Sequence, residues 1–304
     1  MDRESIEYDV VIVGGGPSGL ASACRLKQLN PSLSVCLLEK GSEIGSHILS
    51  GAVFEPKTLF DLFPEDAKDC PTLKTQVAKD DLFWLAGESK SIKVPSWLMP
   101  KSLHNKGNYI ISLGELCQWI SEKAMELGVD IFPGFPAQSY IKDESGRVNG
   151  ISTGDMGIDK EGNQKGTYTP GMDILAKQTI FAEGARGHLG KQLIKEFNLD
   201  EGKTPQHFAI GFKEVWEVEN DIHSAGDVVH TMGWPLNEGT TGGGFLYHFG
   251  NKRIAVGLIV DLNYTNPSHS PFQEFQQFKK HPKIKQFLES GKRVSYGARA
   301  ITKG

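Results

Sequence analysis

The chain has 304 residues, of which 38% are hydrophobic and 23% are charged. This is enough apolar material for one large domain or two interleaved ones, and it excludes disorder as the dominant state. The formal net charge of −4 provides no broad positive surface, which argues against a nucleic acid partner. The sequence contains no run of eighteen apolar residues, so it predicts no helix across a membrane. The four cysteines lack the C-x-x-C spacing of a zinc or iron–sulfur site.

The first forty residues predict a strand, a helix and a second strand. Residues 8–13 are a short, β-branched, nearly continuous apolar run, which is typical of a strand buried on both faces of a parallel sheet. We expect a helix to begin at Pro17, which suits a first helical turn, and to end at residues 30–31 (Asn-Pro). Residues 34–38 predict the second strand. This order is a βαβ unit.

The turn between the first strand and the helix carries the pattern G-x-G-x-x-G at Gly14, Gly16 and Gly19. In such a motif the first glycine permits the tight turn, the second lets the backbone approach a pyrophosphate, and the third lets helix and strand pack closely. Glu39 stands at the end of the second strand, where a carboxylate accepts hydrogen bonds from a ribose hydroxyl. Alone, the glycine pattern would indicate only a structural turn, but the βαβ context favours dinucleotide binding.

The choice of dinucleotide depends on Glu39 and on the residues after it. An acidic residue at this position disfavours the 2′-phosphate of NADP, so FAD and NAD remain. Residues 40–107 mix glycine, proline and aromatic residues, which predicts an insertion and not a third βα unit. A capping box at residues 112–115 begins a helix that we expect to end at Gly128.

The next segments predict short strands and a loop. Residues 129–132, 138–142 and 147–153 are strand-like, and we expect them to form a small antiparallel unit. Residues 155–166 are polar and rich in glycine, which predicts a loop.

A second strand-to-glycine junction lies at residues 179–187, TIFAEGARG. It resembles the segment with which many FAD enzymes of the glutathione-reductase type return to the flavin. An ordinary turn would explain it equally well if it stood alone, but together with the first motif it favours FAD. We therefore predict an α/β fold: a glutathione-reductase-type, Rossmann-like FAD-binding domain with an interleaved, mainly antiparallel β domain.

Longer strings resemble one family along nearly the whole chain. They are EKGSEIGSHILSG at residues 39–51, IFAEGARGHLGKQL at 180–193, HTMGWP at 230–235, and SPFQEFQQFKKHP and GKRVSYGARA between 266 and 300. These strings are similar to the electron-transfer flavoprotein:ubiquinone oxidoreductase family. The resemblance implies a membrane-bound flavoenzyme that accepts single electrons from electron-transfer flavoprotein and delivers them to ubiquinone. It also implies FAD beside a quinone pocket, with no catalytic nucleophile and no metal ligand from these residues.

The resemblance also implies the site residues. Expected cofactor-binding residues belong to the two glycine turns and the segment after Glu39: Gly14, Gly16, Pro17, Ser18, Gly19, Glu39, Lys40, His47, Ser50, Gly51, Glu183 and Gly184. Gly242 and Gly243 match the paired glycines beside the quinone. The family has a tyrosine just before that pair, where this chain has Thr241, so a tyrosine contact to the quinone is in doubt.

The expected domains come from the same resemblance. Residues 1–110 form the first part of the FAD-binding domain, with a membrane-dipping insertion near 44–63; residues 111–200 form its second part; and residues 201–304 form the quinone-binding domain. After Gly304 the family continues with a third flavin-contacting segment and the four cysteines of a [4Fe–4S] cluster. We therefore expect this chain to be a fragment of the enzyme.

The family's location is peripheral, in one leaflet of the inner membrane, on the cytoplasmic face in bacteria or the matrix face in mitochondria. The first seven residues are acidic, where a signal or transit peptide would be basic, so we expect a chain of bacterial type or one already trimmed.

Two other classes of protein stay open. FAD-dependent isoprenoid (geranylgeranyl) reductases and aromatic hydroxylases share the amino-terminal motif and use NAD(P)H, although the hydroxylases usually carry Asp-Gly where this chain has Glu183-Gly184. A non-catalytic flavoprotein remnant is the third class. His188, His230 and His248 match no zinc spacing, and we interpret them as satisfied structural histidines. The lysines at 279, 280, 283 and 285 predict a solvated face or a contact with acidic lipid or protein.

Overall fold

The computed structural model describes residues 3–49, 51–219, 222–236, 239–250 and 252–303. The chain divides into two compact units, each built from two separate segments. The first comprises Met1–Ile48 and Gly114–Lys203, and the second comprises Leu49–Leu113 and Thr204–Gly304. The functional domains predicted from the sequence divide the chain at residues 110 and 200 instead, and they stay predictions.

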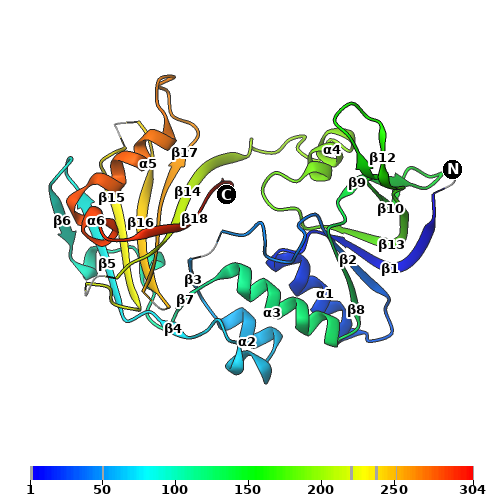
Figure 1. Cartoon of the computed structure of the whole chain (residues 1–304), viewed down its shortest axis with the longest axis horizontal. Coiled ribbons are helices and arrows are strands. Elements are labelled where there is room, and N and C mark those ends of the chain that lie inside the picture. Colours follow the sequence, from blue (N-terminus) through cyan, green and yellow to red (C-terminus); the bar gives the residue numbers. More distant parts are fainter. Residues whose placement is uncertain (1–2, 50, 220–221, 237–238, 251, 304) are drawn as a thin grey trace. The chain divides into compact units, whose positions relative to one another are not determined.

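The first unit contains a six-stranded sheet in the order β8-β2-β1-β13-β10-β9 (Figure 1). Its strands are β1 (Ser5–Val13), β2 (Val35–Glu39), β8 (Val129–Pro133), β9 (Ala137–Lys142), β10 (Val148–Thr153) and β13 (Asp173–Phe181). The first three and β13 run parallel, while β9 and β10 pair antiparallel. The predicted antiparallel unit is therefore wrong for residues 129–132, because this strand pairs in parallel with β2.

Apolar side chains explain the centre of this sheet. Val10 to Val13 are buried in succession, as are Val35 to Leu38, which is the pattern of strands covered on both faces. The helices α1 (Pro17–Leu29) and α3 (Leu113–Glu126) lie where the sequence predicted them, and α4 (His188–Glu196) comes after β13. The Cys24 thiol on α1 contacts the backbone oxygen of Ile120 on α3. The βαβ unit of the first forty residues is thereby confirmed.

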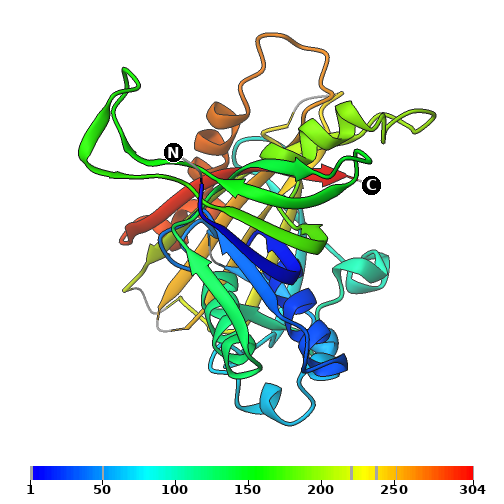
Figure 2. The same cartoon turned by 90° about the vertical axis from the view of Figure 1, so that its right-hand side faces the viewer.

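A two-stranded hairpin stands outside the six-stranded sheet. It consists of β11 (Met156–Ile158) and β12 (Gln164–Thr169), paired antiparallel, and Figure 2 shows this green hairpin projecting from the unit. The prediction of a plain loop over residues 155–166 is therefore wrong. The polar, glycine-rich composition hid the strands because both are short and largely exposed to solvent.

The second unit is built on a seven-stranded sheet in the order β18-β14-β17-β16-β15-β5-β6. Its strands are β5 (Lys79–Leu85), β6 (Ser91–Val94), β14 (His207–Glu217), β15 (Asp227–Gly233), β16 (Gly242–Phe249), β17 (Arg253–Asp261) and β18 (Lys292–Lys303). All neighbours pair antiparallel except β15 and β5. This confirms the mainly antiparallel β domain.

Smaller elements complete the second unit. A three-stranded sheet contains β3 (Ala52–Phe54), β4 (Thr75–Gln76) and β7 (Tyr109–Ile111). The remaining short elements are α2 (Lys57–Leu62) and the 3₁₀ turns η1 (Asp66–Asp69), η2 (Ser96–Leu98) and η3 (Lys101–Leu103).

Two helices cover one face of the large sheet. In Figure 1, α5 (Pro271–Lys280) and α6 (Pro282–Leu288) lie over its strands. Phe275 and Phe278 of α5 are buried in a core that also contains Leu258 of β17. Glu214 on β14 is buried there and accepts hydrogen bonds from both Lys279, at 2.9 Å, and Arg293, at 3.1 Å. Lys279 therefore ties α5 to the sheet, which differs from the solvated face predicted for the lysine run.

Candidate functional site

The glycine turn of the first unit contains two closely packed glycines and one open glycine. Gly14 has φ +114°, and a Cβ atom there would lie 2.4 Å from the backbone oxygen of Ala182. A Cβ on Gly19 would lie 2.0 Å from the backbone oxygen of Gly14. A Cβ on Gly16 would meet nothing within 4 Å. Packing therefore requires Gly14 and Gly19, whereas the space at Gly16 is free for a ligand.

The second glycine junction lies directly beside the first. The Ala182 N–H donates to the Val13 oxygen at 2.8 Å, and the Gly14 N–H donates to the Leu38 oxygen at the same distance. Gly184 lies two residues further on with φ +77° and has no atom within 4 Å of its Cβ position. The carboxyl ends of β1, β2 and β13 thus meet at one edge, which is where ligands bind in open parallel sheets.

The Glu39 carboxylate holds this edge together. One of its oxygens accepts from the Gly15 N–H at 2.9 Å, and the other accepts from the Gly41 N–H at 2.7 Å. His47 lies 3.8 Å away through Nδ1, and its side chain is 50% exposed. The predicted residues Glu39 and His47 are therefore together, and both are within reach of the glycine turn.

The start of α1 fits an anionic group. Gly16 is its N-cap, no side chain caps the helix, and Pro17 occupies the first turn. Uncapped N–H groups and the helix dipole make such a terminus an anion site. Pro17, Ser18 and Lys40 are exposed around it. The open space at Gly16 and the carboxylate at Glu39 together fit the diphosphate and ribose of a dinucleotide such as FAD.

The Glu183 side chain has a structural role at the start of α4. Its carboxylate accepts from the N–H groups of Leu189, at 3.1 Å, and Gly190, at 2.7 Å. The side chain thereby caps the amino end of α4. A contact of this residue with the cofactor would have to come from its backbone.

Two other predicted residues lie outside the first unit. Ser50 lies outside the described residues. Gly51 belongs to the second unit, where it is buried with φ +88° and its Cβ position is 2.3 Å from the Ala255 Cβ atom. Its backbone oxygen accepts from the Lys213 ammonium at 2.8 Å. Burial lowers the pKa of Lys213 to about 8, because desolvation disfavours its charge.

The paired glycines Gly242 and Gly243 begin β16. A Cβ on Gly242 would lie 2.1 Å from the Ile259 oxygen, and a Cβ on Gly243 would lie 2.7 Å from the Thr231 oxygen, so packing alone requires both glycines. The ladder between β15 and β16 ends at the pair Thr231 and Gly244. Gly242 and Gly243 therefore lie past that ladder.

The residue before this glycine pair differs from the family pattern. The Thr241 hydroxyl, which stands in place of the family's tyrosine, donates to the Asp261 carboxylate.

The histidines are not all satisfied. The Nδ1 atom of His230 and the Nε2 atom of His248 are buried and have no hydrogen-bond partner in the described part of the chain. The prediction of satisfied structural histidines is therefore wrong for these two. His188, by contrast, is exposed and its Nε2 lies 3.2 Å from the Gln192 side chain.

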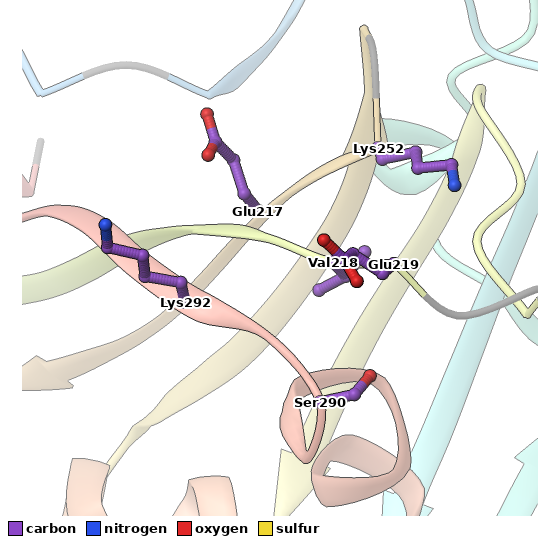
Figure 3. A pocket seen from close by; sticks show the side chains of 6 residues that line it. All are labelled: Glu217, Val218, Glu219, Lys252, Ser290 and Lys292. Atoms are coloured by element: carbon purple, nitrogen blue, oxygen red, sulfur yellow. The ribbon is translucent and has the colours of Figure 1, made fainter.

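A shallow pocket lies at the other end of the seven-stranded sheet. Figure 3 shows its six lining residues, Glu217, Val218, Glu219, Lys252, Ser290 and Lys292. Glu217 pairs in register with Arg253, at the end of β17 opposite to Val260, which pairs with Gly242. The pocket is therefore separate from the glycine pair. It is open and is lined by both acidic and basic side chains, so it indicates no particular ligand.

Metal and membrane features can be stated for the described residues. Within those ranges, no group of three or more histidine, cysteine, aspartate or glutamate side chains is placed to hold a metal ion. No helix there combines the length and the apolar content needed to cross a bilayer. Cys24, Cys36, Cys70 and Cys117 are free and buried, and burial raises the pKa of three of these thiols (Cys24, Cys36 and Cys117) to about 12.

Comparison with known proteins identifies both units. Residues 208–301 match the family described as ETF-QO, ubiquinone-binding, and residues 12–65 match the NAD(P)-binding Rossmann-like domain. Over its full length the chain is 57% identical to the electron transfer flavoprotein-ubiquinone oxidoreductase of Pseudomonas aeruginosa and 46% identical to the human mitochondrial protein. The chain is thus similar to these oxidoreductases along its whole length. It spans about half the length of these relatives, 56% of the bacterial and 50% of the human protein.

The electron transfer flavoprotein-ubiquinone oxidoreductase family shares its fold with other flavoproteins. A geranylgeranyl bacteriochlorophyll reductase-like structure from Thermoplasma acidophilum matches with a TM-score of 0.70 and 19% identity, over 98% of this chain and 67% of that one. The aklavinone-11 hydroxylase, solved with FAD and aklavinone, matches with a TM-score of 0.62 and 13% identity, over 99% and 54% of the two chains. At these identities the likeness shows the fold alone, which is that of FAD-binding flavoproteins.

Proposed function

We propose that this chain is the flavin- and quinone-binding part of an enzyme that passes electrons from reduced electron transfer flavoprotein to ubiquinone. One observation carries the proposal: an uncapped glycine turn suited to a dinucleotide occurs in the same chain as a sheet, residues 208–301, that matches the ubiquinone-binding family. The names of the relatives support the same pair of partners.

FAD is the proposed cofactor. When bound, it supplies the electron-transfer chemistry, and the protein supplies binding and orientation. The N–H groups of Gly16 and Ser18 at the start of α1 would hold the pyrophosphate, and Glu39 would accept hydrogen bonds from the ribose. Gly184 is open for a close approach of the same ligand. Lys40, His47 and Gly51 remain proposed contacts.

Gly242 and Gly243 are the proposed quinone contacts. Their peptide groups lie past the end of the ladder between β15 and β16, where a quinone oxygen would accept from a backbone N–H. Phe245 lies two residues further along the same strand and offers a ring against which a quinone would pack.

The [4Fe–4S] cluster of the whole enzyme is proposed to take its ligands from a region that this chain does not contain. The chain's own cysteines support this assignment, because burial raises the pKa of Cys24, Cys36 and Cys117 and so disfavours the thiolate that binds iron.

Membrane lipid is the third proposed partner, on the inner membrane. The large apolar side chains of the predicted membrane-dipping segment 44–63 are all buried or half-buried. We therefore place the lipid contact on β6 and η2 instead. There Ile92, Trp97 and Leu98 are 60%, 79% and 56% exposed. Exposed lysines flank them at positions 90, 101 and 106. Exposed tryptophan and leucine beside lysine is the composition of a segment that inserts into one leaflet.

Flavin binding tests the cofactor assignment. Glu39→Gln should weaken FAD binding about 10-fold, because a charge-assisted hydrogen bond contributes ~1.5 kcal/mol or more. Flavin fluorescence quenching during titration with FAD measures the change. Glu43→Gln, on the exposed side of the same loop, is the control and should bind like the wild type. Equal affinities for all three proteins, or a purified chain that takes up no flavin, would contradict the assignment.

Electron donors distinguish the enzyme classes. In the full-length enzyme, stopped-flow mixing with reduced electron transfer flavoprotein should reduce the flavin rapidly, and NADPH should do so slowly or not at all. Rapid reduction by NADPH would instead indicate a reductase or hydroxylase.

A further inference from the structure

Three polar side chains form a connected series across the strands β5, β15 and β16. His230 Nε2 lies 3.0 Å from the Tyr247 hydroxyl, and His230 Nδ1 lies 3.7 Å from Asp80 Oδ1. The other Asp80 oxygen accepts from the N–H of Asn105 at 2.8 Å and from its side-chain amide at 2.9 Å. The carboxylate is therefore fixed in place and faces the imidazole.

The two facing atoms take part in no hydrogen bond in the described part of the chain. Asp80 Oδ1 and His230 Nδ1 are both buried. A buried polar atom without a partner costs free energy, so its retention calls for an explanation. The 3.7 Å between the two atoms is longer than a hydrogen bond, but a proton on Nδ1 would point at the carboxylate and be attracted to its charge.

Tyr247, at one end of this series, lies on the same strand as the proposed quinone contacts. His230 is in register with Phe245, and Tyr247 with Val228, while β5 continues the sheet with Asp80 opposite Val228. The rings of Phe245 and Tyr247 stack with their centroids 4.7 Å apart. Alternate residues of a strand share a face, so Gly243, Phe245 and Tyr247 succeed one another on one side of β16. A quinone held at Gly243 and packed on Phe245 would therefore direct its distal oxygen toward the hydroxyl.

Charge and exposure suit proton movement along these three side chains. Burial lowers the pKa of His230, and the Asp80 carboxylate opposes that effect. Burial also raises the pKa of Tyr247, which keeps its proton on the hydroxyl. The side chains of Asp80 and His230 are each 16% exposed, which places solvent at this end of the series, although the facing atoms Oδ1 and Nδ1 are themselves buried. Lys213 is a further titratable group beside this face, and it lies 5.6 Å from the Phe245 ring centroid.

We propose that Asp80, His230 and Tyr247 form a proton relay that supplies one of the two protons for quinone reduction. The inference rests on the proposed function, in which electron transfer flavoprotein supplies the electrons. Conversion of ubiquinone to ubiquinol takes two electrons and two protons. The Tyr247 O–H bond breaks as its proton forms an O–H bond on the distal oxygen of the reduced quinone, and the other oxygen takes its proton from water. Neutral His230 then returns its Nε2 proton to the Tyr247 oxygen. The imidazole takes a proton from solvent on Nδ1, where the Asp80 carboxylate stabilises it.

Tyr247 is the member that reaches the substrate, and the other two act through it. Removing a positioned proton donor slows a proton-dependent step by about 10²-fold or more, whereas a pure electron transfer does not need the donor. The test therefore compares two acceptors in the full-length, FAD-loaded enzyme driven by reduced electron transfer flavoprotein. One is a short-tailed ubiquinone, and the other is ferricenium, which takes up one electron and no proton.

The expected result is a change in the ratio of the two rates. Tyr247→Phe should lower the ubiquinone-to-ferricenium ratio of kcat values at least 10-fold, and Asp80→Asn should lower it in the same direction. The slowed ubiquinone reaction should also show a larger rate decrease in D₂O than the wild type. His248→Gln is the matched control, since His248 is a buried histidine on β16 outside the relay, and it should keep the wild-type ratio.

Other outcomes separate the two proposals. Equal losses with both acceptors would show a structural role and overturn the relay, and so would an unchanged ratio in Tyr247→Phe. A wild-type enzyme that reduces neither acceptor with this donor would overturn the proposed function itself.

Discussion

Single buried side chains carry much of the chemistry of the second unit. Lys213, His230 and His248 are titratable groups of the same seven-stranded sheet, and burial lowers the pKa of each. Desolvation disfavours the charged form of a base, so each group costs stability if it must be charged in the folded state. Such costs are expected where a fold retains polar groups for function.

His248 predicts a particular acid sensitivity. Burial, with the nearby His223 ring, lowers the pKa of His248 to about 4. The unfolded chain, with a pKa near 6.5, therefore binds more protons between these values, and stability falls as the pH drops through that window. The free energy of unfolding should fall by up to about 3 kcal/mol from this group, and His248→Gln should remove that part of the pH dependence.

Urea unfolding midpoints at pH 7, 6, 5 and 4 measure the effect. His104→Gln changes an exposed histidine and should track the wild-type curve. If the His248→Gln curve runs parallel to the wild type over this range, the assigned pKa is wrong.

At the scale of elements, the glycine turn combines close packing within the fold with open space for a ligand. Gly14 and Gly19 are fixed by contacts within the fold, with the third strand, β13, pressing against Gly14 through Ala182. A Cβ atom on Gly16, by contrast, would meet nothing within 4 Å. The same six residues therefore contain positions for packing and a position for the ligand.

Alanine at the two kinds of glycine should give opposite results. Gly19→Ala forces a Cβ against the Gly14 oxygen and should destabilise the chain by about 1–3 kcal/mol. Gly16→Ala should cost no more than about 1 kcal/mol, the effect of a poorer helix cap, yet weaken FAD binding at least 10-fold, because the methyl group enters the pyrophosphate space.

Thermal unfolding without flavin and titration with FAD separate these effects. Each variant is the control for the other. A stability loss well above about 1 kcal/mol in Gly16→Ala, or normal flavin affinity in that variant, would contradict the assignment of the space at Gly16.

At the scale of the whole molecule, the chain interleaves two units by leaving the first after Ile48 and returning at Gly114. The inserted segment provides β5, which carries Asp80, and the exposed η2 turn. A Rossmann-like unit and a unit with a mainly antiparallel sheet are thus built from alternating parts of one sequence.

Lipid binding is the prediction at this scale. The double variant Trp97→Ser with Leu98→Ser should sediment with anionic vesicles at least 10-fold less well than the wild type, because two apolar side chains no longer leave water. Leu199→Ser is a matched control in the first unit, since Leu199 is 57% exposed and Leu98 is 56% exposed. If the double variant binds vesicles as well as the wild type, the lipid contact does not lie on Trp97 and Leu98. The contact would then lie in residues 44–63, or the chain would make no lipid contact of its own.

The sequence alone determined the local features. The strand, helix and strand of the first forty residues were predicted correctly, because spacing along the chain defines them. The cofactor contacts at Gly14 to Gly19 and at Glu39 stay predictions. The family resemblance was confirmed for the same reason, since long strings are specific. The placement of residues 129–132 was wrong because a single strand does not show which neighbour it pairs with.

Only the tertiary structure decided which distant residues meet. β13 lies beside β1, and Glu183 caps α4 instead of facing the turn. Asp80, His230 and Tyr247 come together because β5, β15 and β16 are neighbours in the sheet. Strand order and register result from the burial of apolar faces between remote segments, and burial also sets the pKa of the groups enclosed. These are properties of packing, and no local pattern in the sequence contains them.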